Sequence, residues 1–427
     1  MKRLSAILFA ILMIFSVAGC SGNQKMDNQD AASSSAAVST KDKTLQPEKD
    51  AKPVIWEDND DRITYLKSVA KEFKKKYGID VKIEKITAGE LFNRMVQDAP
   101  VNLGPDLFEM PHDSLGNFIA AGLVQPNDNT AEKIKNDFID SATKCVTYDG
   151  QIYGYPLSIN TYALFYNKKL VSKPAATFQE IMDFAKKYNN PKENKYAFMW
   201  QLSNTYFTHC FLAGYGAYVF GNDGSNKNDI GLNSSNAVEG VKFVHSLKNI
   251  MNVKSADASS EVIDGLFTGG KLPYTINGLW AVSNYKKAGV DFGVAVLPKM
   301  PNGKHAVSFL GVQALFVSAY AKYPNAAKLF AEMASSKDLL MERYQITHEI
   351  PPIKNIENNA AIKSDPYVTA FLQQAQYSTV MPSIPQMNLV WDPYMRALQS
   401  VWDKDMDPKS SMDNCVNIIK SSIAAQK

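Results

Sequence analysis

The chain has few of the residues on which metal and nucleophilic chemistry usually depend. Its 427 residues include 4 cysteines and 5 histidines, and no G-x-S-x-G turn occurs. The histidines lie far apart and form no H-E-x-x-H pair, so the sequence predicts no metal site and no cofactor. Apart from Cys20, which is discussed below, the cysteines are Cys145, Cys210 and Cys415. Because they are odd in number and not closely spaced, we expect no disulfide framework and at least one free thiol.

The chain also has no large excess of positive or negative charge. The formal net charge is +3, and it falls to +1 without Lys2 and Arg3 (3 − 2 = 1). No broad basic face is predicted, so we expect no nucleic-acid partner. The basic run at 74–76 is read as the solvated face of a helix. With 45% hydrophobic and 21% charged residues, the composition is that of an ordinary globular protein.

Only one long apolar run occurs, and it lies at the start of the chain. Lys2 and Arg3 precede a mainly apolar stretch at 4–17, which is typical of a secretory signal and too short to span a bilayer. It ends in Val-Ala-Gly-Cys at 17–20, a pattern that resembles a bacterial lipoprotein signal. We therefore expect removal of 1–19 and lipidation of Cys20, which would hold the protein at the outer leaflet. The alternative is an ordinary secretory signal with a chance cysteine.

The segment at 20–52 has the composition of a flexible linker. It is rich in Ser, Ala, Asp, Lys and Gln, and its only large apolar side chains are Met26, Val38 and Leu45. Such a segment cannot bury enough apolar surface to offset its chain entropy. We therefore expect the folded body to begin near Pro53, which leaves about 375 residues, enough for two domains.

Two short segments partly match ligand-binding loops. Residues 265–271 have the glycines and lysine of a phosphate-binding loop, but Leu272 stands where Ser or Thr must bind magnesium. A helix that ends at 269–270 before a strand is the preferred interpretation. Residues 222–229 could begin a calcium loop, yet Lys227 would face the ion, so a hairpin turn is preferred.

The order of apolar patterns predicts an α/β fold. A strand at 54–56, a helical pattern at 62–77 stopped by Gly78, and an alternating strand at 79–86 imply parallel pairing. The turn at 104–108 leads into a further strand. The same alternation continues with helices expected at 115–123, 177–188, 234–251, 258–268, 324–334 and 337–344.

Seven short blocks, in order along the chain, carry a resemblance to a known family: 54–58, 104–108, 112–113, 155–157, 164–168, 275–280 and 381–387. Together they resemble the maltose and maltodextrin-binding proteins of ABC importers. The resemblance implies a two-lobe fold of the type II periplasmic-binding-protein kind, with sugar in a cleft at a hinge that the chain crosses near residues 160, 312 and 364. The lobes would comprise 53–159 plus 314–360, and 162–311 plus 366–427.

The resemblance also implies what the protein does and with what. It would catalyse nothing, capture an α-glucan oligosaccharide outside the cell, and deliver it to the permease subunits of an ABC transporter. We expect a monomer, lipid-anchored on the extracellular face of a Gram-positive bacterium. Two alternatives stay open: another oligosaccharide, such as a galacto- or xylo-oligomer, or a lipid-anchored glycoside hydrolase that uses two cleft carboxylates.

The residues at the matching blocks suit sugar chemistry. A pyranose has an apolar C–H face and a rim of hydroxyls, so its site needs aromatic platforms edged by carboxylates and amides. By resemblance, Trp280, Trp391 and Tyr206 stack on sugar rings, Asp113 accepts hydroxyl hydrogen bonds, and Met387 packs at the cleft. The full set of expected ligand-binding residues is Glu57, Asp58, Asp60, Asp61, Met110, Asp113, Asn160, Asn204, Tyr206, Trp280, Met387 and Trp391.

Each of these interpretations has an alternative. The acidic cluster at 57–61 follows the first strand, where open α/β sheets bind ligands, but it could also cap the helix that begins near Arg62. Glu57 is the residue of this cluster that we expect to contact the sugar directly. Trp280 and Trp391 could instead fill a core, as buried tryptophans usually do.

The chain also departs from the best-known maltose binders. Met110 stands where those proteins have a cleft tryptophan, and Ser114 where they have an arginine. Asn160 and Asn204 replace glutamates, and Asp61 replaces a lysine. One stacking surface and several charged groups are therefore missing, and the chain resembles more closely the maltodextrin and cyclodextrin binders of Gram-positive bacteria.

Overall fold

The computed structural model describes residues 45–426, and the expected signal sequence and Cys20 lie outside this range. Among the described helices, none is long and apolar enough to cross a bilayer. The cysteines at 145, 210 and 415 are free, which agrees with the prediction of at least one free thiol, and all three are buried. The described residues also contain no cluster of side chains that could hold a metal ion.

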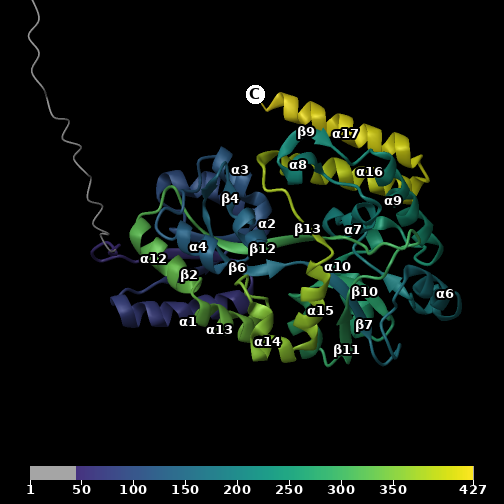
Figure 1. The fold of residues 1–427 in the computed structure, drawn as a ribbon, viewed down its shortest axis with the longest axis horizontal. Helices are drawn as coiled ribbons and strands as arrows, with labels where there is room; N and C mark the ends of the chain where they lie inside the picture. Colours follow the sequence, from purple (N-terminus) through teal and green to yellow (C-terminus); the bar gives the residue numbers. More distant parts are fainter. Residues whose placement is uncertain (1–44, 427) are drawn as a thin grey trace, which may run out of the picture. The chain divides into compact units, whose positions relative to one another are not determined.

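A first sheet of six strands organises one half of the body. Its order is β13-β12-β3-β1-β2, and β6 also pairs with β12. The strand β1 is parallel to β2, as predicted, and also to β3, whereas β12 is antiparallel to β3 and β6. Figure 1 shows β12 and β6 side by side near the middle of the fold. The bounds are β1 Val54–Glu57, β2 Lys82–Lys85, β3 Leu107–Pro111, β6 Gly154–Asn160, β12 Ser308–Val317 and β13 Ser378–Val380.

The helix α1 (Asp60–Tyr77) shows why the sequence of this half folds as it does. The Asn59 side chain accepts hydrogen bonds from the amides of Asp61 and Arg62 at its start, and Gly78 ends it with a φ of 72°. Its buried face packs against α12 (Pro324–Ala334) and α13 (Lys337–Thr347). The other helices of this half are α2 Ala88–Asp98, α3 Leu115–Ala120, α4 Ala131–Asp137 and α5 Asp140–Cys145.

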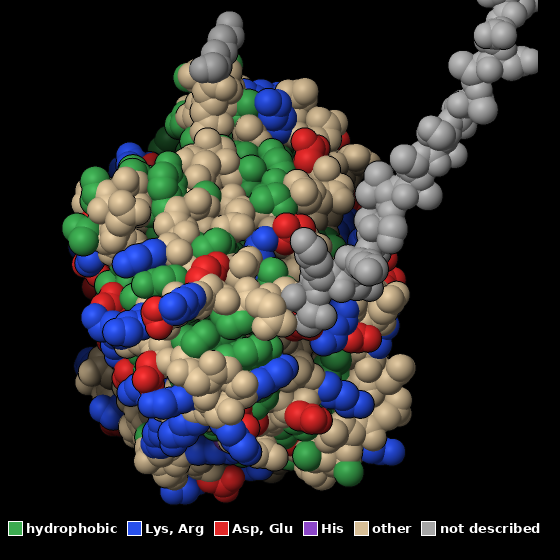
Figure 2. All heavy atoms as spheres, turned by 90° about the vertical axis from the view of Figure 1, so that its left-hand side faces the viewer, with side chains coloured by type: hydrophobic (Ala, Val, Ile, Leu, Met, Phe, Trp, Pro, Cys, Tyr) green, Lys and Arg blue, Asp and Glu red, His purple; other side chains and the backbone are tan. Residues whose placement is uncertain are grey.

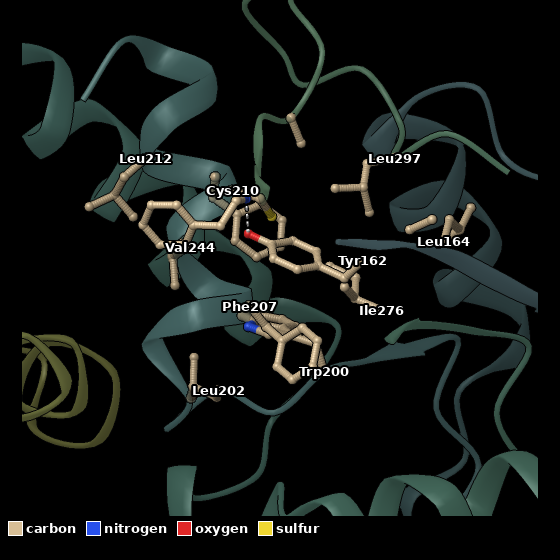
Figure 3. Close-up of a cluster of buried hydrophobic side chains, with 14 of the residues drawn as sticks. Tyr162, Leu164, Trp200, Leu202, Phe207, Cys210, Leu212, Val244, Ile276 and Leu297 are labelled. Atoms are coloured by element: carbon tan, nitrogen blue, oxygen red, sulfur yellow. Dashed lines mark hydrogen bonds between the residues drawn. The ribbon is translucent and has the colours of Figure 1, made fainter. Parts of the chain in front are cut away.

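A second sheet of four strands organises the other half. Its order is β11-β7-β10-β8, with bounds β7 Tyr162–Asn167, β8 Phe198–Met199, β10 Tyr274–Gly278 and β11 Phe292–Ala295. Figure 3 shows its core, where Tyr162 points between Cys210 and Phe207; the Tyr162 hydroxyl accepts the amide hydrogen of Phe309. The helices of this half are α6 Phe178–Tyr188, α7 Thr205–Tyr215, α9 Ser235–Ser246, α10 Ser260–Thr268, α11 Ala281–Lys287, α14 Ala360–Ser364, α15 Pro366–Ala375, α16 Trp391–Lys404 and α17 Pro408–Ala425.

Two separate hydrophobic cores divide the body into two lobes, as the fold class predicts. Trp56, Phe73 and Phe316 belong to the core of the first lobe, and Trp200 and Phe371 to that of the second. Residue 161 leads from β6 of the first sheet to β7 of the second, and the chain returns from β11 of the second sheet to β12 of the first. The exact residues at which one lobe ends and the other begins stay a prediction.

The folded body extends upstream of Pro53. Glu48 accepts hydrogen bonds from the amides of Asn325 (2.7 Å) and Ala326 (3.0 Å) at the start of α12, and Ala51 is 4% exposed. A carboxylate is favourable at a helix N-terminus because it satisfies free N–H groups and the helix dipole. Residues 45–52, which composition assigns to the flexible linker, therefore pack on the first lobe.

Both loop-like segments adopt the preferred alternatives. The helix α10 ends at Thr268, Gly270 has a φ of 69°, and β10 follows. Gly221 pairs antiparallel with Asn226, while Asn222 and Asp223 turn the chain with φ angles of 51° and 53°. The first segment is thus a helix end before a strand, and the second a hairpin turn.

The surface carries mixed charge. Figure 2 shows Lys and Arg side chains interspersed with Asp and Glu over one face of the first lobe. Lys74 pairs with Asp80 at 2.7 Å, and the side chains of the run at 74–76 are exposed. The basic run is therefore a solvated helix face, as expected.

Candidate ligand-binding site

A large cavity lies between the two lobes. Its volume is about 1100 Å³, and side chains of both lobes line it. From the first lobe come residues that directly follow β1 and β3, among them Asp58, Asn59 and Asp113. From the second come Tyr206 and Trp280. Side chains at the carboxyl ends of parallel strands are where α/β sheets bind ligands. We call this space the cleft cavity.

Aromatic side chains form one wall of the cleft cavity. Tyr206 of α7, Trp280 and Trp391 of α16 line it, and all three are partly exposed. The rings of Tyr206 and Trp280 lie 6.5 Å apart between centroids, and Trp391 meets Phe309 edge to face at 6.2 Å. Phe309 in turn stacks on Tyr206 at 6.0 Å. The wall therefore presents flat, apolar and accessible surface.

Amides and carboxylates surround that wall. Asn160 donates a hydrogen bond from its side-chain amide to Gln313 (3.2 Å), and both line the cleft cavity. Asp264 accepts a hydrogen bond from the hydroxyl of Tyr285, which lies beside it. The Asn204 side chain caps α7 by accepting from the amide of Tyr206. The cavity thus combines aromatic faces with hydrogen-bonding groups, which suits a neutral polyhydroxyl ligand.

A buried network of charges supports the first-lobe wall. Arg343, with no exposed surface, donates to Glu109 (2.6 and 3.2 Å) and to Glu349 (2.7 and 3.1 Å). Arg62 donates to the other oxygen of Glu349 at 2.7 and 2.9 Å, and Ser158 also donates to Glu349 (3.0 Å). The two guanidinium groups hold the pKa of Glu349 at about 2 against the effect of burial. The network fixes Arg62 at the edge of the cleft cavity.

Glu57 lies beside this network. It is 2% exposed, its Oε1 accepts the amide hydrogen of Asn59 (2.9 Å), and Arg62 Nη1 lies 3.7 Å from the same oxygen. Its Oε2 has no hydrogen-bond partner within the described part of the chain. Burial first, and then the nearby carboxylate of Glu109, raise the pKa of Glu57 well above its usual range.

The structure brings together seven of the twelve residues expected at the site. The seven that line the cleft cavity are Asp58, Asp113, Asn160, Asn204, Tyr206, Trp280 and Trp391. Glu57 and Met110 line a smaller, adjoining cavity instead. That the seven contact a ligand stays a prediction.

The other three expected residues lie elsewhere. Asp60 is exposed and pairs with Lys85 at 2.6 Å, while Asp61 lies 3.5 Å from Lys287. Met387 is fully buried in the core of the second lobe. The cap of α1 is Asn59 rather than a carboxylate of the acidic cluster.

Several lining residues were not identified from the sequence. Met395 lies four residues after Trp391 on α16, so helical spacing could have found it. Asn277 and Met381 lie inside two of the matching blocks. No local signal marks the others, which are brought in by tertiary folding: Arg62, Gln201, Asp264, Asn284 and Gln313.

Two α/β lobes with an aromatic and polar cavity between them are the arrangement of a binding protein whose ligand site lies between its lobes. Comparison with known proteins gives the family. Residues 68–370 match the model of the bacterial extracellular solute-binding proteins, and the chain belongs to this family. It is therefore a binding protein and not an enzyme, and the glycoside hydrolase alternative is wrong.

Similar proteins bind oligosaccharides. The galactooligosaccharide-binding protein of Bacillus subtilis (strain 168) is 30% identical over 100% of this chain and 98% of its own length. The maltooligosaccharide ABC transporter solute-binding lipoprotein of Streptococcus pneumoniae (strain R6) is 30% identical over 84% of this chain and 86% of its own. A solved cyclo/maltodextrin-binding protein complexed with maltotetraose has a TM-score of 0.79 and 38% identity, covering 89% of this chain and 99% of its own.

Proposed function

We propose that this protein captures maltodextrin-type α-glucan oligosaccharides in the cleft cavity and delivers them to an ABC importer. The observation that carries the proposal is the cavity itself: about 1100 Å³ between two lobes, with three accessible aromatic side chains and a rim of amides and carboxylates. A cavity of this size suits an oligosaccharide rather than an ion or a single small metabolite. The similarity to proteins named for maltooligosaccharide and cyclo/maltodextrin binding supports it.

On this proposal, ligand binding closes the two lobes about the hinge. Asp58 and Asp113 belong to the first lobe, and Tyr206 and Trp280 to the second, so one sugar chain would touch both. A ligand that contacts both lobes binds the closed state better, and that difference in affinity shifts the population. The hinge would lie where the chain crosses between the lobes, near residues 160, 312 and 364. The closed form is what the transporter would recognise as loaded.

A second candidate is a galactooligosaccharide binder. The relative named for that ligand aligns over the whole chain, including the N-terminal region. Met110 stands where the best-known maltose binders have a tryptophan, so this chain lacks one of their stacking surfaces. Because galactosyl and glucosyl rings both offer apolar faces to aromatic side chains, the aromatic wall alone does not distinguish the two ligands.

A calorimetric titration against a panel of oligosaccharides tests the assignment. We expect saturable 1:1 binding of maltotriose and maltotetraose, and weaker binding of β-1,4-galactotriose and xylotriose, because the panel differs in the hydroxyls that meet the polar rim. If galactotriose bound most tightly, the second candidate would replace the first. If no oligosaccharide bound, the proposed function would be wrong.

The anchor is the other part of the proposal. We infer that Cys20 carries the lipid and that the protein acts as a monomer on the extracellular face of a Gram-positive cell. The Streptococcus pneumoniae relative is named a lipoprotein, which supports this inference. Cys20→Ser should release the protein from the membrane fraction, because it removes the thiol that would carry the lipid. Cell fractionation measures this, and an unlipidated variant that still pellets with membranes would contradict it.

A further inference from the structure

A small cavity adjoins the cleft cavity and is lined by side chains of the first lobe. We call it the side pocket; its volume is about 100 Å³, room for a few non-hydrogen atoms of a ligand. Asp58, Arg62, Pro111 and Gln313 line both cavities, so the two cavities lie next to each other at these side chains.

The walls of the side pocket are of two kinds. One part is apolar, with Trp56, Leu91, Met110 and Phe118; the other is polar, with Glu57, Arg62, Glu109 and Gln313. A group that fits the side pocket must therefore offer both apolar surface and a hydrogen-bonding atom.

Two polar groups at this pocket have unused hydrogen-bonding capacity. Glu57 Oε2 is buried without a hydrogen-bond partner among residues 45–426. Arg62 uses Nε and Nη2 for Glu349, whereas its Nη1 lies 3.7 Å from Glu57 and 3.8 Å from Asp58, beyond hydrogen-bond distance. A buried polar atom without a partner is costly, so native structures rarely leave one unless a ligand or water satisfies it.

The charges around the pocket decide what kind of group can enter. Two arginines, at 62 and 343, already balance two glutamates, at 109 and 349. Burial and the nearby carboxylate of Glu109 raise the pKa of Glu57, which favours the neutral form of its carboxyl group, and a neutral carboxyl group can donate as well as accept. An entering carboxylate or phosphate would meet Asp58 and Glu109 without a free positive charge to offset them. The pocket therefore suits a neutral hydroxyl.

We infer that the side pocket is a subsite for the exocyclic hydroxymethyl group of one hexose ring of the bound oligosaccharide, with its hydroxyl hydrogen-bonded to Glu57 and Arg62. The methylene would lie against the apolar side and the hydroxyl against the polar side. The inference rests on the proposed function, because it requires an oligosaccharide in the cleft cavity. It assigns to this protein a selectivity for hexoses over pentoses, which lack the hydroxymethyl group.

A double-mutant cycle tests this subsite. The probe is whichever of maltotriose and β-1,4-galactotriose binds more tightly, together with its three analogues that carry a 6-deoxy sugar at one ring each. In the wild-type protein, one analogue should bind on the order of tenfold or more weakly than the parent, because it leaves the buried polar groups unpaired. In Glu57→Leu that penalty should shrink to about twofold or less, since the interacting partner is gone.

Three controls make the result specific. Glu57→Gln, which keeps a neutral hydrogen-bonding group, should retain most of the penalty. Asp80→Asn, at an exposed carboxylate beside Lys74, should leave it unchanged. Melting temperatures show whether Glu57→Leu is folded. If it is not folded, the titrations of the wild-type protein and of Glu57→Gln still test the subsite.

The outcomes separate the two proposals. If the parent bound and all three 6-deoxy analogues bound equally well, the subsite would be wrong while the proposed function stood. A penalty that is the same in wild type and Glu57→Leu would place the hydroxymethyl group elsewhere and also overturn the subsite. If neither trisaccharide bound at all, the proposed function would fail, and the subsite with it.

Discussion

Replacing Arg343 with methionine should lower the free energy of unfolding by about 3–5 kcal/mol. Arg343 has no exposed surface and donates to Glu109 and Glu349, both of which are also buried. Methionine fills similar space but leaves two carboxylates with one remaining guanidinium, that of Arg62. Urea unfolding at pH 7 measures the change.

The same experiment carries its own control and a pH signature. Lys186→Met removes an exposed pair with Asp183 and should change stability by about 1 kcal/mol or less. The pKa of Glu349 is lowered to about 2, so its stabilising contribution is present above its unfolded pKa of about 4.3 and is lost as the pH falls toward 2. Arg343→Met should weaken that dependence. If Arg343→Met lowered the free energy of unfolding by less than about 1 kcal/mol at pH 7, the charge network would not be what stabilises the first lobe.

Trp280→Ala and Trp391→Ala should each weaken oligosaccharide binding by about 1 kcal/mol or more without unfolding the protein. Both side chains line the cleft cavity and are partly exposed, so they present a ring face to a ligand. Removing either leaves one platform fewer for a sugar ring, and removing both should abolish measurable binding at micromolar protein. Calorimetry and thermal melting are measured on the same preparations.

The matched control is another tryptophan of the same lobe. Trp402 is 1% exposed and donates from its indole nitrogen to the carbonyl of Val253 (2.8 Å). Trp402→Ala should therefore destabilise the protein by about 3–5 kcal/mol, through the loss of core packing. A loss of stability with unchanged affinity in Trp280→Ala or Trp391→Ala would make those residues part of the core.

The periodic parts of the fold were predictable because local physics determines them. A helix at 62–77 follows from apolar spacing and from Gly78, and the structure places α1 at Asp60–Tyr77. The helix α7 (Thr205–Tyr215) was not predicted, because nearly all of its residues are buried and no polar face reveals a helical period. Residues 45–52 were assigned to a linker because one capping contact, from Glu48 to α12, is invisible in composition.

The residues of the binding site were also predictable only in part. Resemblance to known sugar binders identified Tyr206, Trp280 and Trp391, which line one cavity although they are up to 185 residues apart in the sequence. Glu57, which we expect to contact the sugar directly, lines the adjoining cavity instead and is buried beside Arg62. Only the folded chain brings Glu349, 287 residues from Arg62, into the network that sets the environment of Glu57. A local pattern carries no information about such a contact.

Small-angle scattering with and without saturating oligosaccharide tests the central claim, that one ligand is held by both lobes. We expect a smaller radius of gyration in the loaded protein, with a decrease that follows the calorimetric binding curve, because a ligand shared between the lobes favours the closed state. Trp280→Ala should show no decrease at concentrations where it does not bind. An unchanged radius in wild-type protein, with binding confirmed in the same sample, would contradict closure and leave a rigid pocket.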